Sequence, residues 1–128
     1  MTRRLTGTIF LAALLAVSAQ ARADGDAANG AEVFGQFCKQ CHVPIPGDPL
    51  AAPDLGGVIG RPLADESGYR YSDAFLAKRA EGLVWTEDRL EEFLRDPQEA
   101  IPGTIMAFVG VKRASWRRDL LAYLRTLD

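Results

Sequence analysis

The two cysteines and the single histidine of this 128-residue chain fall within five consecutive residues. Cys38, Lys39, Gln40, Cys41 and His42 form a Cys-x-x-Cys-His sequence. Two thiols at this spacing on a helical turn can each add to a vinyl group of the same porphyrin, and the adjacent imidazole then faces the iron. The motif therefore predicts one covalent haem c, with thioether links to Cys38 and Cys41 and with His42 as an axial ligand.

Three other kinds of site use cysteines at this spacing. A structural zinc site needs four ligands, and the chain offers two thiols and one imidazole without a second cluster. A thioredoxin-like redox pair belongs to a βαβ pattern, which the sequence does not show after this motif. An inert disulfide is the third alternative. We favour haem attachment because it uses both cysteines and the histidine.

The first 23 residues have the organisation of an export signal. Two early arginines give a basic start, residues 9–17 form an apolar run, and residues 21–23 read Ala-Arg-Ala, a cleavage pattern. A retained anchor is the alternative, but the apolar stretch of about 11 residues is shorter than the roughly 20 that span a bilayer. We expect residues 1–23 to be a cleaved signal peptide. Residues 24–128 would then form one domain in an oxidising bacterial periplasm.

Removal of the signal makes the domain more acidic. The whole chain has 15 basic and 17 acidic residues, a formal net charge of −2. Residues 1–23 contain three arginines and no acidic residue, so residues 24–128 carry 12 basic and 17 acidic residues and a net charge of −5. This balance does not favour nucleic acid or an anionic membrane surface as a partner. A haem would also add apolar core to a domain of only about 105 residues.

The first part of the domain predicts one helix followed by a long loop. A cap at Asp26 or Asn29 would begin the helix, which would run to about Gln40. Residues 43–61 are dense in proline and glycine and are expected to be loop. One apolar face of this helix would contain Val33, Phe34, Phe37 and Cys41.

Three further helices are predicted after this loop. Ser72 would cap a short helix near residues 73–80, and Thr86 would cap another that the next proline stops. A loop over residues 98–113 would lead to a final helix capped by Ser115. The predicted core positions of the last two helices are Leu90, Phe93, Leu94, Trp116, Leu120, Tyr123, Leu124 and Leu127. Without a strand pattern, the sequence predicts an all-α fold of three to five helices and long loops around one haem.

The second axial position of the iron is best explained by a methionine. The chain has no other histidine, and its two methionines are Met1, inside the predicted signal, and Met106. Met106 lies between Gly103 and Gly110, where the backbone can approach a cofactor closely. The alternatives are that Met106 fills a gap in the core, or that a lysine or no residue completes the site. Met/His ligation fills both axial positions and raises the potential, which favours electron transfer over catalysis.

These motifs resemble the class I cytochromes c of the mitochondrial and bacterial soluble types. The resemblance covers roughly residues 25–127 and implies the cytochrome c fold, one haem c and no enzymatic activity. It rests on Gly30 and Phe34 before the Cys-x-x-Cys-His motif, Pro53-Asp54-Leu55, Gly60-Arg61, Tyr69-Arg70-Tyr71-Ser72, Trp85, Ile101-Pro102-Gly103-Thr104 before Met106, Phe108, Gly110 and Asp119-Leu120-Leu121-Ala122-Tyr123-Leu124.

The resemblance also implies roles for individual residues. Pro53 would accept a hydrogen bond from Nδ1–H of the axial imidazole and fix its tautomer. Tyr71 and Trp85 would bind a buried haem propionate, with Arg61 close enough to offset its charge, and Thr104 would belong to the haem-contacting loop. From residue type alone, the aromatic residues would be ordinary core and Arg61 a solvated cation.

Other family features set expectations for packing and surface. Gly30 would let the first and last helices cross closely near Tyr123. Phe93 stands where many relatives have a tyrosine that reaches the methionine sulfur, and about three extra residues lie between the Tyr-x-Tyr segment and Trp85. Ile105 replaces a lysine of mitochondrial forms, so the haem edge would be more apolar. Some positive charge near the final helix would remain, as solvated side chains, at Lys112, Arg113, Arg117 and Arg118.

The function implied is that of a monomeric one-electron carrier of a respiratory or photosynthetic chain. It would accept electrons from a cytochrome bc-type complex or a dehydrogenase and pass them to an oxidase, peroxidase or photosynthetic centre. Contact would be brief and through the exposed haem edge, without stable membrane insertion. A dedicated acceptor of one periplasmic dehydrogenase is an alternative. A haem enzyme or gas sensor is another, and it would need an open position on the iron.

Overall fold

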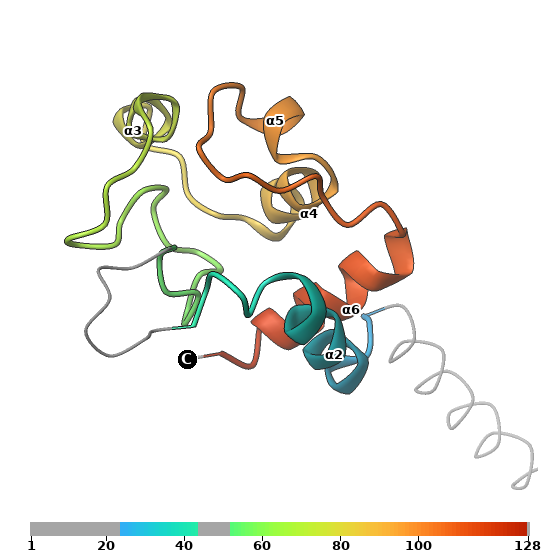
Figure 1. The fold of residues 1–128 in the computed structure, drawn as a ribbon. Helices are drawn as coiled ribbons and strands as arrows, with labels where there is room; N and C mark the ends of the chain where they lie inside the picture. The colour runs from blue at the N-terminus through green and yellow to red at the C-terminus, as the bar shows by residue number, and fades with distance from the viewer. Residues whose placement is uncertain (1–23, 44–51, 128) are drawn as a thin grey trace, which may run out of the picture.

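The computed structural model describes residues 24–43 and 52–127 (Figure 1). Its helices are α2 (Ala27–Phe37), α3 (Asp73–Ala80), α4 (Glu87–Arg95), α5 (Pro97–Ala100) and α6 (Ala114–Leu124). In these ranges the only sheet-like pairing is an isolated bridge between Pro62 and Val84. The predicted all-α class is therefore confirmed. None of the helices in the described ranges has the length and hydropathy needed to cross a membrane; the predicted signal peptide lies outside them.

Side-chain caps begin three of the helices where the sequence predicted them. Asp26, Ser72 and Thr86 each accept a hydrogen bond from a backbone N–H two or three residues later, at distances of 2.9 to 3.3 Å. Such bonds satisfy N–H groups that the first helical turn leaves without partners. Between the two predicted candidates for the first cap, the structure selects Asp26.

Two predicted helix boundaries are wrong by a few residues. Helix α2 ends at Phe37 rather than near Gln40, because the backbone N–H groups of Cys41 and His42 both turn back to the Cys38 carbonyl. The final helix begins one residue before Ser115, and no side chain caps it. The turn after α2 therefore places Cys41 and His42 outside the helix.

The loop predicted over residues 98–113 contains part of an additional short helix. Pro97 ends α4 as expected, but it is also the first residue of α5. Proline suits this position because the first helical N–H needs no partner and its φ is already helical. Asp96 caps α5 by accepting a hydrogen bond from the Glu99 N–H at 3.1 Å. This turn carries the chain from the end of α4 into the segment that contains Met106.

Helices α2 and α6 cross at very short range (Figure 1). A Cβ atom on Gly30 would lie 1.9 Å from the backbone oxygen of Asp119 and 2.8 Å from Cβ of Tyr123, so only glycine allows this approach. The ring of Phe34 packs against Tyr123 with centroids 5.3 Å apart. The predicted crossing at Gly30 is confirmed, and it joins the two ends of the domain.

Helix α4 packs against α6, and its last residue makes another close backbone contact, with Gly110. Gly110 has a φ of 93°, and a Cβ there would lie 2.1 Å from the Arg95 carbonyl oxygen at the end of α4. The next N–H, of Val111, donates to the Leu94 carbonyl at 2.7 Å. The segment after Met106 is therefore fixed to α4. The apolar core between these elements includes the predicted Leu90, Phe93, Leu94, Leu120 and Leu124.

Candidate haem-binding site

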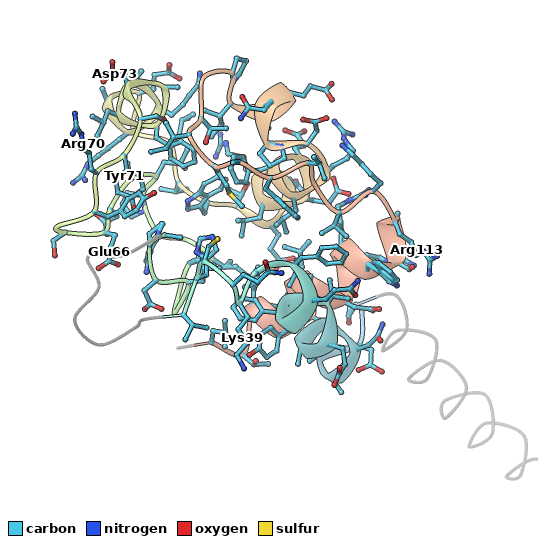
Figure 2. All side chains as sticks on the ribbon, in the orientation of Figure 1. Lys39, Glu66, Arg70, Tyr71, Asp73 and Arg113 are labelled. Carbon is cyan, nitrogen blue, oxygen red and sulfur yellow. The ribbon has the colours of Figure 1, made fainter. Side chains whose placement is uncertain are left out.

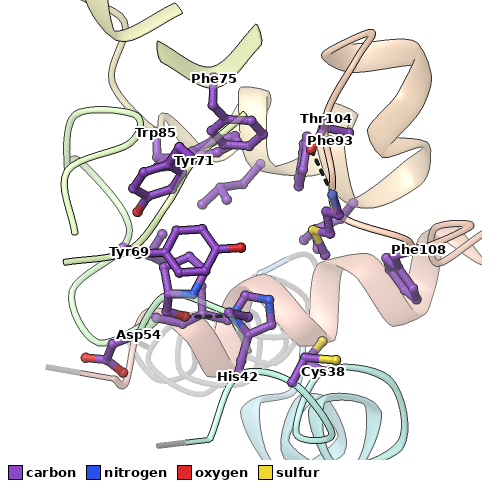
Figure 3. Close-up of a pocket in the computed structure, with 18 of the residues that line it drawn as sticks. Cys38, His42, Asp54, Tyr69, Tyr71, Phe75, Trp85, Phe93, Thr104 and Phe108 are labelled. Carbon is purple, nitrogen blue, oxygen red and sulfur yellow. Dashed lines mark hydrogen bonds between the residues drawn. The ribbon is translucent and has the colours of Figure 1, made fainter. Parts of the chain in front are cut away.

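A cavity of about 480 Å³ lies at the centre of the described chain, with side chains from almost every element around it. Figure 3 shows His42 and Cys38 on one side and Thr104 and Phe93 across from them. All the residues that the sequence predicted for the site line this one cavity: Cys38, Cys41, His42, Pro53, Arg61, Tyr71, Trp85, Thr104 and Met106. The fold thus brings together segments that are far apart in the sequence.

The imidazole of His42 is held in one tautomer. Its Nδ1 donates a hydrogen bond of 2.7 Å to the carbonyl oxygen of Pro53, the contact that the resemblance implied. Burial lowers the pKa of His42, while the bond to Pro53 and the charge of Asp54 oppose this shift. With the proton on Nδ1, Nε2 carries the lone pair, which is the form that binds a metal ion.

The two thiols lie in different surroundings. Cys38 is buried, and this burial, with a smaller effect of Cys41, raises its pKa to about 11. Cys41 is exposed at the residue level although it also lines the cavity. A redox-active Cys-x-x-Cys pair relies on a thiolate of lowered pKa, and the protonated thiol of Cys38 is the opposite case.

Met106 reaches the cavity from a loop that Thr104 supports. Thr104 is 6% exposed, and its Oγ1 accepts a hydrogen bond from the Met106 N–H at 3.3 Å. The side-chain amide of Gln98 on α5 donates to the Thr104 carbonyl at 3.0 Å. Gly103, with a φ of 90°, provides the turn that precedes them. These contacts give Thr104 a structural role in the loop, whatever contact it also makes with a cofactor.

Aromatic rings form one wall of the cavity. Trp85 is 8% exposed, and its ring centroid lies 5.2 Å from that of Phe93 and 6.0 Å from that of Phe75. Tyr71 stacks on Phe75 at 5.9 Å and meets Tyr69 edge-on at 4.7 Å. The sequence assigned no role to Tyr69 or Phe75; the signal for Tyr69 is its place in the Tyr-Arg-Tyr-Ser segment that resembles the family.

The Tyr71 hydroxyl marks a polar corner of this wall. It accepts a hydrogen bond from the Glu66 N–H at 3.2 Å, and burial raises its pKa. Because that bond uses the hydroxyl as an acceptor, its proton remains free to donate. The corner can therefore supply a hydrogen-bond donor to an anionic group inside the cavity.

Arg61 is half-buried, so the expectation of a solvated cation from residue type alone does not hold. Its Nη1 donates to the Gly56 carbonyl at 2.8 Å and its Nη2 to the Asp54 carbonyl at 3.0 Å. Among the described residues, its buried Nε has no hydrogen-bond partner. A buried donor of this kind needs an acceptor, and a charged guanidinium group favours an anionic one.

These features fit a haem. The cavity is within the range that buries a large planar ligand, and most of its lining is apolar. Two thiols, one imidazole and one thioether provide attachment points and iron ligands, while the unpartnered Arg61 Nε and the Tyr71 hydroxyl suit the acidic substituents of a porphyrin.

Proteins similar in sequence to this chain are also haem proteins of the cytochrome c type. The chain is 42% identical over 104 residues to a cytochrome c of Tetrahymena pyriformis, covering 81% of this chain and 91% of that protein. It is 40% identical over 103 residues to cytochrome c2 of Rhodopila globiformis, covering 80% and 94%. No family model matches the chain.

A solved structure extends the similarity to the fold. The structure of cytochrome cH from Methylobacterium extorquens matches with a TM-score of 0.68 and 37% identity, over 80% of this chain and 99% of that one. These relatives match over most of their own length as well as most of this chain. The chain therefore belongs to the cytochrome c family, whose members carry one covalently attached haem c and transfer electrons rather than act as enzymes.

Proposed function

We propose that Cys38 and Cys41 carry the haem through thioether bonds and that His42 and Met106 are its two axial ligands. The observation that carries this proposal is that one cavity is lined by the chain's only histidine and by its only methionine after residue 23. When bound, the haem supplies a reversible one-electron couple. With a side chain on each axial position, the iron offers no vacant site for a substrate.

The residues around the cavity hold and orient the cofactor. Pro53 keeps the His42 ring in the metal-binding tautomer and makes it a stronger ligand. Arg61, Tyr71 and Trp85 bind the haem propionates, because Arg61 and Tyr71 have donors left free by their protein contacts and Trp85 has one N–H to give. The apolar wall excludes water from the ring and favours the less charged, reduced state of the iron.

The same proposal includes cleavage after Ala23 and export to the periplasm. Residues 24–26 are anchored to the far end of the domain: the Asp24 carbonyl accepts from Arg125 Nη1 at 3.0 Å, and the Asp26 N–H donates to Asp119 at 2.8 Å. A domain that starts at Asp24 therefore has a fixed first residue. Similarity to the cytochrome c2 of a bacterium supports the periplasmic assignment.

The partners are redox proteins that meet the haem edge briefly. Beside Met106, Ile105 is 61% and Val109 is 79% exposed, so the surface next to the iron ligand is apolar. Figure 2 shows the charged residues Lys39, Glu66 and Arg113 at separate places around the described chain. A cytochrome bc-type complex or a dehydrogenase would donate the electron, and an oxidase, peroxidase or photosynthetic centre would accept it. Small interfaces of this kind allow fast exchange.

A visible and near-infrared spectrum of the purified holoprotein tests the ligand assignment. We expect a methionine–iron charge-transfer band in the oxidised protein and no response of the reduced protein to carbon monoxide. A high-spin spectrum that shifts with carbon monoxide would contradict the proposal and would redirect attention to a sensor or enzyme.

A further inference from the structure

Arg117 is a buried cation on α6. The sequence predicted it as a solvated charge at the start of the final helix, and that prediction is wrong: the residue is only 7% exposed. Arginine is seldom buried unless its charge is paired and its donors are satisfied. The hydrogen-bond partners of Arg117 therefore indicate which parts of the fold its charge holds together.

The guanidinium group of Arg117 joins three elements. Its Nε donates to Oε1 of Glu91 on α4 at 2.6 Å. Its Nη1 donates to two backbone carbonyls, of Val111 at 2.8 Å and of Lys112 at 2.9 Å. Glu91 is the only carboxylate that the structure pairs with this cation in the described ranges, and its side chain is 35% exposed.

The two carbonyls belong to the C-terminal end of the loop that carries Met106. At the other end, Thr104 and Gln98 hold the loop, as described above. Between these two anchors, Ile105 and Val109 project outward and contribute little packing. Within the loop, Phe108 packs against Phe37 with ring centroids 6.2 Å apart. The retention of Met106 in the cavity therefore depends on this contact and on how firmly each end is fixed.

We propose that Glu91 is a positioning residue for the Met106 ligand, acting through Arg117. This inference rests on the proposed axial role of Met106. Removing the carboxylate leaves a buried guanidinium without a counter-charge, and such a group gains by turning toward water. In doing so it releases the carbonyls of Val111 and Lys112 and leaves the Val111 N–H bond to Leu94 as a remaining tie at this end. The more weakly held loop would open more often and would expose the sixth position of the iron more often.

Binding of imidazole to the oxidised holoprotein measures this opening. The apparent affinity of an added ligand scales with the fraction of molecules whose iron position is open. We expect Glu91→Ala to bind imidazole about tenfold more tightly than the parent protein, as read from loss of the methionine–iron band. Glu91→Gln keeps an acceptor for Arg117 and should show a smaller gain. It also provides a folded variant should Glu91→Ala fold poorly.

Glu87→Gln is the matched control. Glu87 lies one turn earlier on α4 and makes an ion pair of the same 2.6 Å length, with Arg125. That arginine contacts Asp24 and not the Met106 loop. Glu87→Gln should lower the midpoint of chemical unfolding yet leave imidazole affinity within about twofold of the parent.

The outcomes separate this inference from the assignment of the ligands. If the parent protein lacked a methionine–iron band, the proposed ligands themselves would be contradicted. A parent with the band, in which Glu91 and Glu87 variants gain imidazole affinity equally or not at all, would overturn only the positioning role of Glu91. A selective gain in the Glu91 variants supports it.

Discussion

The guanidinium groups of Arg61 and Arg117 are both at least partly buried, but they differ in what balances their charge. Arg117 has a carboxylate partner, Glu91, within the protein. Arg61 has only the carbonyls of Gly56 and Asp54 and a buried Nε without a partner among the described residues. The first site is electrostatically complete, whereas the second calls for an anion. The haem propionate that we propose at Arg61 would explain this difference between two residues of the same type.

The ion pair between Glu87 and Arg125 gives a prediction about acid stability. Two bonds of 2.6 and 2.7 Å join the carboxylate to the guanidinium, and this pairing lowers the pKa of Glu87. A carboxyl group with a lowered folded-state pKa adds stability above its ordinary unfolded pKa and loses that contribution as the pH falls through the folded pKa. Both groups are partly exposed, so we expect Glu87→Gln to reduce the free energy of unfolding at neutral pH by only about 0.5–1 kcal/mol.

The difference between Glu87→Gln and the parent should shrink toward zero in acid, as measured by denaturant titrations from about pH 7 to about pH 3. Asp88→Asn is the control, because it removes a charge from the same first helical turn, and among the described residues Asp88 forms no hydrogen bond or ion pair with Arg125. An equal loss in both variants would mean that the helix dipole, and not the ion pair, is responsible.

At the scale of whole elements, the crossing of α2 and α6 depends on one glycine. A Cβ at Gly30 would collide with the backbone of Asp119, and backbone cannot move aside as a flexible side chain can. We expect Gly30→Ala to lower the free energy of unfolding by about 2–3 kcal/mol, measured by chemical denaturation of the holoprotein.

Gly35, on the same helix, is the matched comparison. Nothing lies within 4 Å of the position where its Cβ would be. Alanine is favoured over glycine inside a helix by roughly 0.5–1 kcal/mol, so Gly35→Ala should stabilise the protein. If both substitutions changed stability in the same direction, the close crossing would not be the cause.

The sequence predicted these elements well where the signal was local. The caps at Asp26, Ser72 and Thr86 and the stop at Pro97 each depend on side chains next to the boundary, and all are present. Helix α5 was missed because a proline that ends one helix can also begin the next. The early end of α2 was missed because the turn after it is made by backbone carbonyls, which the sequence does not specify.

For the whole molecule, the cavity predicts that folding depends on the haem. Without the cofactor, about 480 Å³ at the centre would lack partner atoms. Water that entered this partly open space would find few polar partners on its apolar walls, so the walls would lose their packing contacts without compensation. A domain whose total stability is only about 5–15 kcal/mol is not expected to tolerate that loss.

We therefore expect a variant with Cys38→Ser and Cys41→Ser, produced without haem, to show little helix by far-ultraviolet circular dichroism. The haem-loaded parent serves as the reference for full helix content. A cooperative unfolding transition in the haem-free variant, with native near-ultraviolet signals, would show that the protein core alone suffices.

The composition of the site was predictable from the sequence, but most of its supporting contacts were not. Cys38, Cys41, His42, Met106 and the other residues predicted to hold the haem all line one cavity. By contrast, the pairs Glu91–Arg117 and Lys112–Asp96 join residues 26 and 16 positions apart. Nothing in the spacing of surface-type charges indicates which of them will meet or be buried, because the fold decides that.

His42 and Met106 reach the same cavity from distant parts of the chain. With these two residues as its ligands, the iron closes a loop of about 65 residues, as a disulfide would. A permanent cross-link of that span would restrict the unfolded chain by about 4 kcal/mol in the chain-entropy model. Unlike a disulfide, the proposed link would pass through bonds to iron, and metal–ligand bonds depend on the charge of the metal. Each electron that arrived or left would then also alter how tightly the two halves of the polypeptide are tied together.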